Sequence, residues 1–294
     1  MQRVESELKR LVQEVGYEDV ATLFGALEGG KRLRAKLILL IAKENQKAPL
    51  LAAIIELIHA ASLLHDDVID EADTRRGKPS INATEGSKTA VMLGDILYSK
   101  GFSELVEFDK SIAKTVATSV TQLSVGEMMD VKMSEYFNTN EKKYLDMLYL
   151  KTATLIEACA SSGAILAGLD PSAYALYGRN LGLSFQIIDD ILDITSDEAT
   201  LGKPAMNDFT EGKMTLPYIY LYEDLPNDDK LKLQSLHKKS LSSEDIEWIK
   251  TKMQEYGSIE KAYNLAKQLS DEAKAAVEDP TLWGILDKMI QRSY

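Results

Sequence analysis

Residues 57–70 read LIHAASLLHDDVID, and residues 181–193 read LGLSFQIIDDILD. Both stretches begin with apolar residues typical of a core helix and end in the same acidic pattern, Asp-Asp-x-x-Asp. Residues three and four positions apart share one face of a helix, so the outer carboxylates of each motif lie one turn apart and point the same way. The acidic residues are Asp66, Asp67, Asp70, Asp189, Asp190 and Asp193.

Two clusters of carboxylates repel one another unless a positive charge lies between them. Hard divalent cations bind oxygen ligands. Mg²⁺ in particular takes one or two carboxylates per ion and fills its other positions with water and phosphate oxygens. The paired motifs therefore predict magnesium ions that clamp a diphosphate, with these aspartates as the candidate metal ligands.

The composition argues against some partners. Lys and Arg number 34 and Asp and Glu number 46, a formal net charge of −12, and the isoelectric point is near 4.9. Such a charge opposes any general attraction to nucleic acid or anionic lipid. We expect no nucleic-acid partner, and a polyanionic substrate has to be attracted by a local basic site.

The chain lacks the features expected of a secreted or membrane protein. Its single cysteine, Cys159, lies in an apolar stretch and cannot form an internal disulfide, which fits a reducing compartment. Residues 1–14 carry both signs of charge without an apolar block. No segment approaches the roughly 18 apolar residues that would span a bilayer. We expect a soluble, cytoplasmic protein with no transmembrane segment.

Apolar residues recur at three and four positions along most of the chain, and only 7 prolines interrupt it. This pattern predicts an all-α protein, and no linker divides it, so we expect a single domain over residues 1–294. Residues 227–229 and 242–245 are typical of helix starts with capping side chains and acidic first turns. The expected helices span 2–15, 17–28, 31–45, 48–71, 86–108, 111–132, 141–167, 172–195, 214–223, 227–236, 243–255, 257–275 and 280–292.

Basic residues gather where an anion held by the acidic motifs needs them. Residues 29–34 read GGKRLR and open a predicted helix, where free N–H groups, the helix dipole and side-chain cations all favour phosphate. Arg75 and Arg76 follow the first motif. Further candidates are Lys151, beside Thr152 in an otherwise apolar helical pattern, and Lys203 and Lys213 in the loop after the second motif.

Over roughly residues 20–270, the acidic motifs and the basic segments follow one another in the order found in the trans (head-to-tail) polyprenyl diphosphate synthases, and the chain resembles that family. The resemblance implies an isoprenoid-synthase fold, a single-domain helical bundle around a deep central cavity. It favours the medium- or long-chain type, similar to octaprenyl diphosphate synthases. The matching segments are GGKRLR at 29, IHAASLLHDDVIDEADTRRGKPS at 58, KTA at 151, FQIIDDILD at 185, GKP at 202, and GK with TLP at 212.

The resemblance implies electrophilic prenyl transfer from an allylic diphosphate, such as farnesyl or geranylgeranyl diphosphate, to isopentenyl diphosphate. About three Mg²⁺ ions, for which Mn²⁺ can substitute, hold the allylic diphosphate. The implied direct ligands are Asp66, Asp70 and Asp189, and the outer or water-bridged ones are Asp67, Asp190 and Asp193. Arg75, Lys151 and Lys203 grip the same diphosphate, with Lys213 nearby. Isopentenyl diphosphate lies on Lys31, Arg34, His59 and Arg76, while Thr152 and Gln186 point oxygens at the allylic cation.

In the family that the chain resembles, product length depends on the residues one helical turn before the first motif. Ala61 and Ser62 are both small, whereas synthases that stop at fifteen or twenty carbons usually place an aromatic ring there. A medium or long product follows, with Phe102 or Phe137 as candidate floors of the cavity.

Three other functions compete with this interpretation. One is a short-chain farnesyl or geranylgeranyl diphosphate synthase. Another is a class I terpene cyclase, which does not need a second diphosphate site. The third is a silent regulatory subunit, a type that usually loses one aspartate motif. The resemblance also implies a homodimer. Departures from the family pattern are Ala35 in place of a proline, Asp130 in place of a glutamine, and a carboxyl terminus, QRSY, that lacks the usual basic tail.

Overall fold

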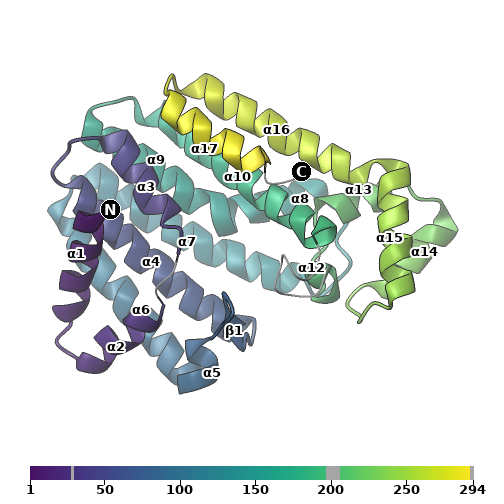
Figure 1. The fold of residues 1–294 in the computed structure, drawn as a ribbon, viewed down its shortest axis with the longest axis horizontal. Helices are drawn as coiled ribbons and strands as arrows, with labels where there is room; N and C mark the ends of the chain where they lie inside the picture. The colour runs from purple at the N-terminus through teal and green to yellow at the C-terminus, as the bar shows by residue number, and fades with distance from the viewer. Residues whose placement is uncertain (28–29, 197–205, 292–294) are drawn as a thin grey trace. The chain divides into compact units, whose positions relative to one another are not determined.

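A computed structural model describes residues 1–27, 30–196 and 206–291. The described chain is helical apart from loops and one short hairpin, so the all-α prediction is confirmed (Figure 1). The first elements are α1 (Gln2–Gln13), α2 (Glu18–Ala26), α3 (Leu33–Ala42), α4 (Ala48–Ile69), β1 (Thr74–Arg75), β2 (Lys78–Pro79), α5 (Ile81–Glu85), α6 (Ser87–Glu104) and η1 (Leu105–Glu107). Next come α7 (Lys110–Met133), α8 (Glu141–Leu148), η2 (Tyr149–Ala153), α9 (Thr154–Ala167) and α10 (Pro171–Thr195). The last are α12 (Asn207–Thr210), α13 (Leu216–Asp224), α14 (Asn227–Leu236), α15 (Ser243–Tyr256), α16 (Ser258–Ala276) and α17 (Pro280–Ile290).

The chain forms two compact units, whose boundaries fall inside α7, α9 and α10. The first unit contains residues 1–120 and 158–175, and the second contains residues 121–157 and 176–294. Each acidic motif therefore belongs to a different unit. The expectation of one domain over residues 1–294 stays a prediction.

Helix α4 is the core of the first unit and packs against α1, α3 and α6. Most of its residues are buried, which fits its largely apolar sequence. This helix corrects one expectation. It is 22 residues long with a mean hydropathy of 1.6, so it is long and apolar enough to cross a membrane, but 78% of its apolar window is buried inside the protein. Glu56 and His59 interrupt the apolar residues of this segment, so the sequence shows only shorter unbroken apolar runs there.

The second unit is built on α10, which is likewise buried along most of its length and carries the whole second motif. Helix α13 packs against α15 and α16 in the same unit, and α16 packs against α17. These packed helices enclose fully buried rings such as Tyr177, Phe209 and Tyr218.

The predicted helix ends hold to within a few residues, and the differences have local causes. Ser242 caps α15 and forms a reciprocal capping box with Asp245, as expected. The predicted cap at residues 227–229 is wrong, because Pro226 is the N-cap and Asn227 is already helical. The predicted helix over residues 141–167 is interrupted by a π-helical turn, η2. The loop after the first motif contains the antiparallel pair of β1 and β2.

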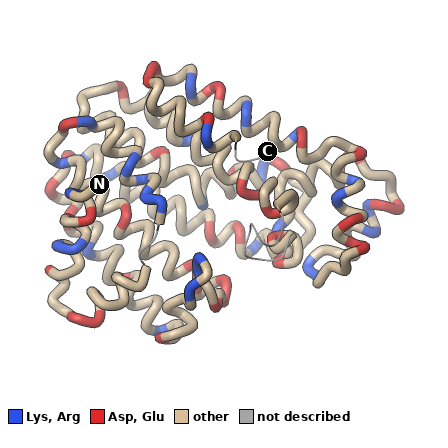
Figure 2. The backbone as a smooth tube through the Cα atoms, in the orientation of Figure 1, with Lys and Arg blue, Asp and Glu red and all other residues tan. Residues whose placement is uncertain are grey.

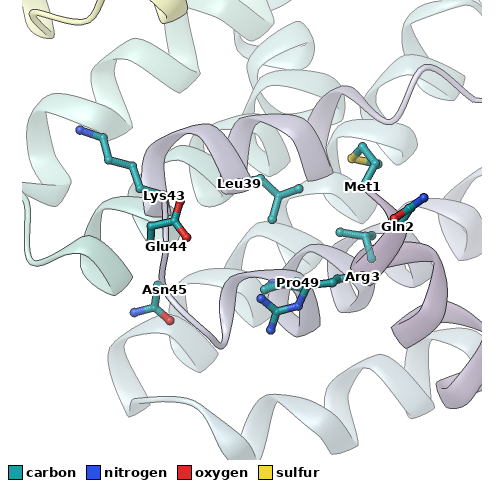
Figure 3. A pocket seen from close by; sticks show the side chains of 9 residues that line it. Met1, Gln2, Arg3, Leu39, Lys43, Glu44, Asn45 and Pro49 are labelled. Carbon is teal, nitrogen blue, oxygen red and sulfur yellow. The ribbon is translucent and has the colours of Figure 1, made fainter.

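A surface pocket of about 560 Å³ lies in the first unit between the start of α1 and the end of α3 (Figure 3). Its lining includes Arg3, Lys43 and Asn45. None of the predicted site residues lines it, and it has no part in the chemistry considered below.

Candidate functional site

The first motif lies at the end of α4, and its middle carboxylate is tied to an arginine. Asp67 is only 2% exposed. Nε of Arg75 donates to both oxygens of Asp67, at 2.8 and 2.9 Å, and its Nη2 lies 2.7 Å from Oδ1. A buried carboxylate needs such a partner, and the β1–β2 hairpin supplies it by folding Arg75 back onto the helix. Asp66 is half-buried and Asp70 is exposed at the C-cap.

The second motif shows a similar division between exposed and buried carboxylates. Asp189 is exposed, whereas Asp190 and Asp193 are each 3% exposed. Asp190 accepts hydrogen bonds from Tyr144 Oη and, at 3.2 Å, from Gln186 Nε2. Asp193 Oδ2 accepts a hydrogen bond from the main-chain N–H of Asp208 at 3.2 Å. This bond holds Asp208, a further acidic residue, next to the second motif.

Burial raises the pKa of Asp190 well above its ordinary value, and the negative charges of Asp208 and Asp189 raise it further. The hydrogen bonds from Tyr144 and Gln186 act in the opposite direction. Crowded carboxylates of this kind lower their mutual repulsion when a cation binds nearby.

The predicted isopentenyl diphosphate residues come together within the first unit. Arg34 Nη1 lies 3.0 Å from His59 Nε2. A Cβ on Gly30 would lie 3.1 Å from Arg76 Nη1, so the glycine lets the guanidinium of Arg76 lie against the backbone next to Lys31. Lys31 itself is exposed. Figure 2 shows basic positions at the start of α3 and after α4. The structure therefore brings these predicted residues together, and their role in binding isopentenyl diphosphate stays a prediction.

His59 is neutral in this cluster. Burial lowers the pKa of His59 well below 6.5, and the positive charges of Arg34, Arg76, Arg75 and Arg32 lower it further. Because Arg34 donates to Nε2, the ring proton of the neutral imidazole is on Nδ1. The Nε atom of Arg34 is buried and has no hydrogen-bond partner among the protein groups that the structure describes. A phosphate oxygen would be a suitable acceptor for it.

Glu56 anchors the turn at residues 32–35 that leads into α3, a role that sequence reasoning missed. Its side chain is 3% exposed. Oε2 accepts from Arg32 Nη1 at 3.2 Å and Oε1 accepts from the Ala35 N–H at 3.1 Å. Arg32 has the left-handed backbone conformation, with φ of 50°. Ala35 thus uses an N–H that a proline would lack. The signal in the sequence was a lone carboxylate inside an apolar helix.

In the second unit, two glycines let their helices approach the π-helical turn that carries Lys151 and Thr152. A Cβ on Gly126 of α7 would lie 2.2 Å from the Lys151 main-chain nitrogen. A Cβ on Gly182 of α10 would lie 2.6 Å from the Cα of Ala153. Single π-helical turns inside α-helices often occur at functional sites.

Lys151 is held by two buried carboxylates one turn apart on α7. Its Nζ lies 2.5 Å from Asp130 Oδ2 and 3.0 Å from Glu127 Oε2. Burial lowers the pKa of Lys151, but the charges of Asp130 and Glu127 raise it more, so the net shift is upward and the ammonium stays charged. Asp130, a departure from the family pattern, is therefore the closest partner of this lysine. Glu127 was missed because nothing in the sequence linked it to Lys151.

Thr152 and Gln186 meet as a pair. Thr152 Oγ1 donates to Gln186 Oε1 at 3.2 Å. Gln186 lies four residues after Gly182 on α10, so the close approach at the glycine brings the two side chains into contact. Tyr144, which orients the neighbouring Asp190, carried no sequence signal.

The loop after the second motif is described only from residue 206 onward, so Lys203 lies outside the described residues. Lys213 Nζ lies 2.9 Å from Glu211 Oε2, and its main-chain N–H donates to the Asp208 carbonyl at 2.8 Å. Burial lowers the pKa of Lys213, but Asp130, Glu211 and Asp208 raise it more, so this lysine is also charged.

The small residues predicted to set product length are buried on α4. Ala61 is 0% and Ser62 is 4% exposed, and Ser62 Oγ donates to the His59 carbonyl at 2.9 Å. Of the candidate floors, the ring of Phe102 stacks on Tyr98 in the first unit. Phe137 packs against Tyr222 and His237 in the second.

The described residues contain no group of three or more His, Cys, Asp or Glu side chains arranged to hold a metal ion. The donor chemistry nevertheless fits a hard cation. Each motif offers outer carboxylates on one helix face, and Mg²⁺ needs only one or two protein carboxylates per ion when a diphosphate supplies the remaining oxygens. The assignment of individual aspartates as ligands stays a prediction.

An all-α fold that presents two Asp-Asp-x-x-Asp motifs and a separate cationic cluster defines a class, the isoprenoid synthases. The polyprenyl synthetase family model matches residues 20–253. The chain belongs to this family and is a polyprenyl diphosphate synthase, a prenyltransferase whose family uses divalent metal ions.

Relatives of different product length resemble the chain. The octaprenyl pyrophosphate synthase from Helicobacter pylori is 44% identical with a TM-score of 0.92, covering 99% of this chain and 97% of that one. A short chain isoprenyl diphosphate synthase from Methanothermobacter thermautotrophicus is 37% identical over 85% of this chain and 80% of its own length. A Caulobacter crescentus polyprenyl synthase, solved with calcium and isoprenyl diphosphate, is 30% identical with a TM-score of 0.87, covering 99% and 94%.

Replacing Gly182 by alanine should lower both stability and activity. The new Cβ would collide with the Ala153 backbone, and overpacking of a core typically costs about 1–3 kcal/mol. Displacement of the π-helical turn should also reduce turnover, because Lys151 and Thr152 move with it. Thermal unfolding and a prenyl-transfer assay measure the two effects. Gly284→Ala in α17 is the matched control, since nothing lies within 4 Å of its Cβ. Equal behaviour of the two variants would contradict the close approach.

The free energy of unfolding should decrease as the pH falls below 6.5, partly because of His59. The unfolded chain binds a proton at this histidine near pH 6.5, while the folded chain does not. The contribution has a slope of at most about 1.4 kcal/mol per pH unit. Denaturant unfolding at pH 7 and pH 5 should show a smaller loss for His59→Gln than for the wild-type protein, with His65→Gln as a control. The same loss in His59→Gln and wild type would show that the ring is not buried neutral.

Proposed function

We propose that this protein elongates an allylic diphosphate, such as farnesyl or geranylgeranyl diphosphate, by trans head-to-tail condensation with isopentenyl diphosphate. The product is a medium- or long-chain polyprenyl diphosphate, and diphosphate is released. The observation that carries the proposal is the separate cationic cluster of Arg34, His59 and Arg76, because it provides a second diphosphate site in addition to the acidic motifs.

Isopentenyl diphosphate binds to the cluster in the first unit. Lys31 and Arg76 attract the diphosphate, and the unused Nε of Arg34 donates to one of its oxygens. The Nδ1–H of neutral His59 offers a further donor without adding a charge that would have to be desolvated. Glu56 holds the turn through Arg32 and Ala35, so these donors stay in place before substrate arrives.

The allylic diphosphate binds where the acidic motifs supply metal ligands. We assign Asp66, Asp70 and Asp189 as direct ligands of about three Mg²⁺ ions, for which Mn²⁺ can substitute. The buried Asp67, Asp190 and Asp193 are already engaged by protein groups, which supports outer roles for them. When bound, the metal ions stabilise the negative charge that develops on the leaving diphosphate.

Basic side chains of the protein stabilise the leaving diphosphate, and polar side chains stabilise the allylic cation. Lys151, with Arg75, Lys203 and Lys213, offers charge to the same leaving diphosphate. Lys151 is poised for this because Asp130 and Glu127 keep it charged within a mostly buried site. The oxygens of Thr152 and Gln186 stabilise the allylic cation, and the buried setting keeps water away from it. The released diphosphate takes the last proton.

A medium or long product is supported by Ala61 and Ser62. Neither side chain is large enough to stop a growing isoprenoid one turn below the first motif. Similarity to the octaprenyl synthase of Helicobacter pylori supports the same assignment, whereas similarity to the short chain synthase keeps a farnesyl or geranylgeranyl product as the alternative.

We further propose a homodimer in the cytoplasm. On α7, Val125, Met128 and Val131 follow one another at helical spacing and are 45%, 59% and 41% exposed. An exposed apolar stripe of this kind fits the same surface of a second copy. The cytoplasmic location rests on the buried free thiol of Cys159 and the acidic composition.

The two remaining alternatives are disfavoured by particular residues. A class I terpene cyclase has no use for a second diphosphate cluster such as Arg34, His59 and Arg76. A silent subunit usually lacks one acidic motif, and both are intact here.

The purified protein should incorporate labelled isopentenyl diphosphate into longer chains when it is incubated with Mg²⁺ and farnesyl diphosphate. Asp66→Ala and Asp189→Ala should each lower turnover about 100-fold or more if these carboxylates hold metal. Asp271→Ala, at an exposed position of α16, is the control and should leave turnover unchanged. No elongation by the wild-type protein would refute prenyl transfer, and near-normal turnover of the two variants would refute their role as ligands.

Ala61→Tyr should shorten the product sharply, because the ring fills the space one turn below Asp66. Chromatography of the dephosphorylated products measures chain length. Retained turnover in the first condensation with geranyl diphosphate shows that the variant folds. An unchanged product length in a variant that is active in this first step would contradict the barrier.

A further inference from the structure

Tyr144 belongs to a chain of hydrogen bonds that ends at the pair assigned to the allylic cation. Its hydroxyl donates to Asp190 Oδ2. Asp190 Oδ1 accepts from Gln186 Nε2 at 3.2 Å. Gln186 Oε1 in turn accepts from Thr152 Oγ1 at 3.2 Å. All four residues lie in the second unit, and Tyr144 and Asp190 are each 3% exposed.

The direction of donation along these hydrogen bonds follows from the chemistry of the groups that form them. A glutamine amide has two different ends, a carbonyl oxygen that accepts and an NH₂ group that donates. Asp190 presents Oδ1 as an acceptor, so the NH₂ end of Gln186 turns toward it and the carbonyl end turns toward Thr152. The opposite orientation would place two acceptors against each other at Asp190 and leave an NH₂ group beside the cation.

The backbone around the pair leaves it little freedom to compensate. The close contact of Gly182 with Ala153 sets the distance between α10 and the turn that carries Thr152. Within that fixed spacing, the remaining freedom of Gln186 is rotation of its side chain, which Asp190 restrains. Asp190 itself is restrained through its second oxygen by Tyr144.

We propose that Tyr144 is a positioning residue, which acts through Asp190 to hold the carbonyl end of Gln186 toward Thr152 and the allylic cation. Asp190 serves in this relay as a hydrogen-bond acceptor, which agrees with an outer rather than a direct role toward the metal ions. The inference rests on the proposed prenyl transfer, and it concerns how faithfully the cation is directed to isopentenyl diphosphate.

If Gln186 loses this orientation, we expect a defined side product. The carbon–oxygen bond of the allylic diphosphate breaks, and the diphosphate leaves with the electron pair. If the cation is poorly shielded, a water oxygen bonds to carbon 1 and loses a proton to solvent, which yields the free allylic alcohol. The ratio of this alcohol to elongated product therefore reports on the orientation of Gln186 and Thr152.

The first test is Tyr144→Phe, which removes the hydroxyl and keeps the ring. With farnesyl diphosphate, isopentenyl diphosphate and Mg²⁺, turnover should fall about tenfold, the effect of one lost hydrogen bond to a buried carboxyl group. The farnesol fraction should rise severalfold, while the KM values for both diphosphates stay within about twofold, because no phosphate-binding group is changed. Tyr177→Phe is the matched control. Its hydroxyl is also buried in the second unit but donates to the Leu282 carbonyl at 2.9 Å.

The second test asks whether Tyr144 acts through Gln186. Gln186→Leu removes both ends of the amide, so adding Tyr144→Phe to that variant should change the farnesol fraction little further. Non-additivity of this kind is the expected signature of two residues in one network. A purely structural role of Tyr144 would instead lower the unfolding temperature and affect turnover equally in both backgrounds.

The outcomes separate the two proposals. An unchanged farnesol fraction in Tyr144→Phe, a change equal to that of Tyr177→Phe, or fully additive effects with Gln186→Leu would overturn the positioning role. A wild-type protein that does not elongate farnesyl diphosphate would overturn the proposed function itself.

Discussion

The burial of the middle aspartate in each acidic motif is the constraint on which the site depends. A carboxylate removed from water needs hydrogen-bonding or charged partners. For Asp67 the partner is Arg75, which requires the β1–β2 hairpin to turn back toward α4. For Asp190 the partners are Tyr144 and Gln186, which requires α8 and α10 to lie together. Each buried carboxylate thereby organises the residues around a neighbouring carboxylate that is less buried, Asp66 or Asp189.

Cations that are removed from water likewise need partners of opposite charge. Lys151 is paired with Asp130 and Glu127, and Arg32 is paired with Glu56. An acidic protein can hold a concentrated positive site in this way, because the counter-charges are built into the adjacent helices. The strain is local. Arg32 and Arg76 both adopt positive φ, at 50° and 54°, in the two turns that present the cationic cluster. Such conformations occur often at functional sites.

Membership of the polyprenyl synthetase family defines the chemistry more closely than the product. Relatives that make octaprenyl and short-chain products resemble the chain at 44% and 37% identity. Because relatives with different products resemble the chain to a similar degree, overall similarity carries little information about product length. Our proposal of a longer product therefore rests on the small side chains of Ala61 and Ser62, one turn below the first motif.

The sequence by itself determined the helices, the acidic motifs and the cations near them, because apolar periodicity and charge are properties of neighbouring residues. It also identified Arg34 and His59 as one cluster, through the resemblance to the family. Only the tertiary structure revealed Glu56 under Arg32, Asp130 and Glu127 around Lys151, and Tyr144 behind Asp190. These partners lie on different helices and are separated by 21 to 46 residues along the chain. No local pattern links such residues, since their contact exists only once glycines such as Gly126 and Gly182 have let the helices pack closely.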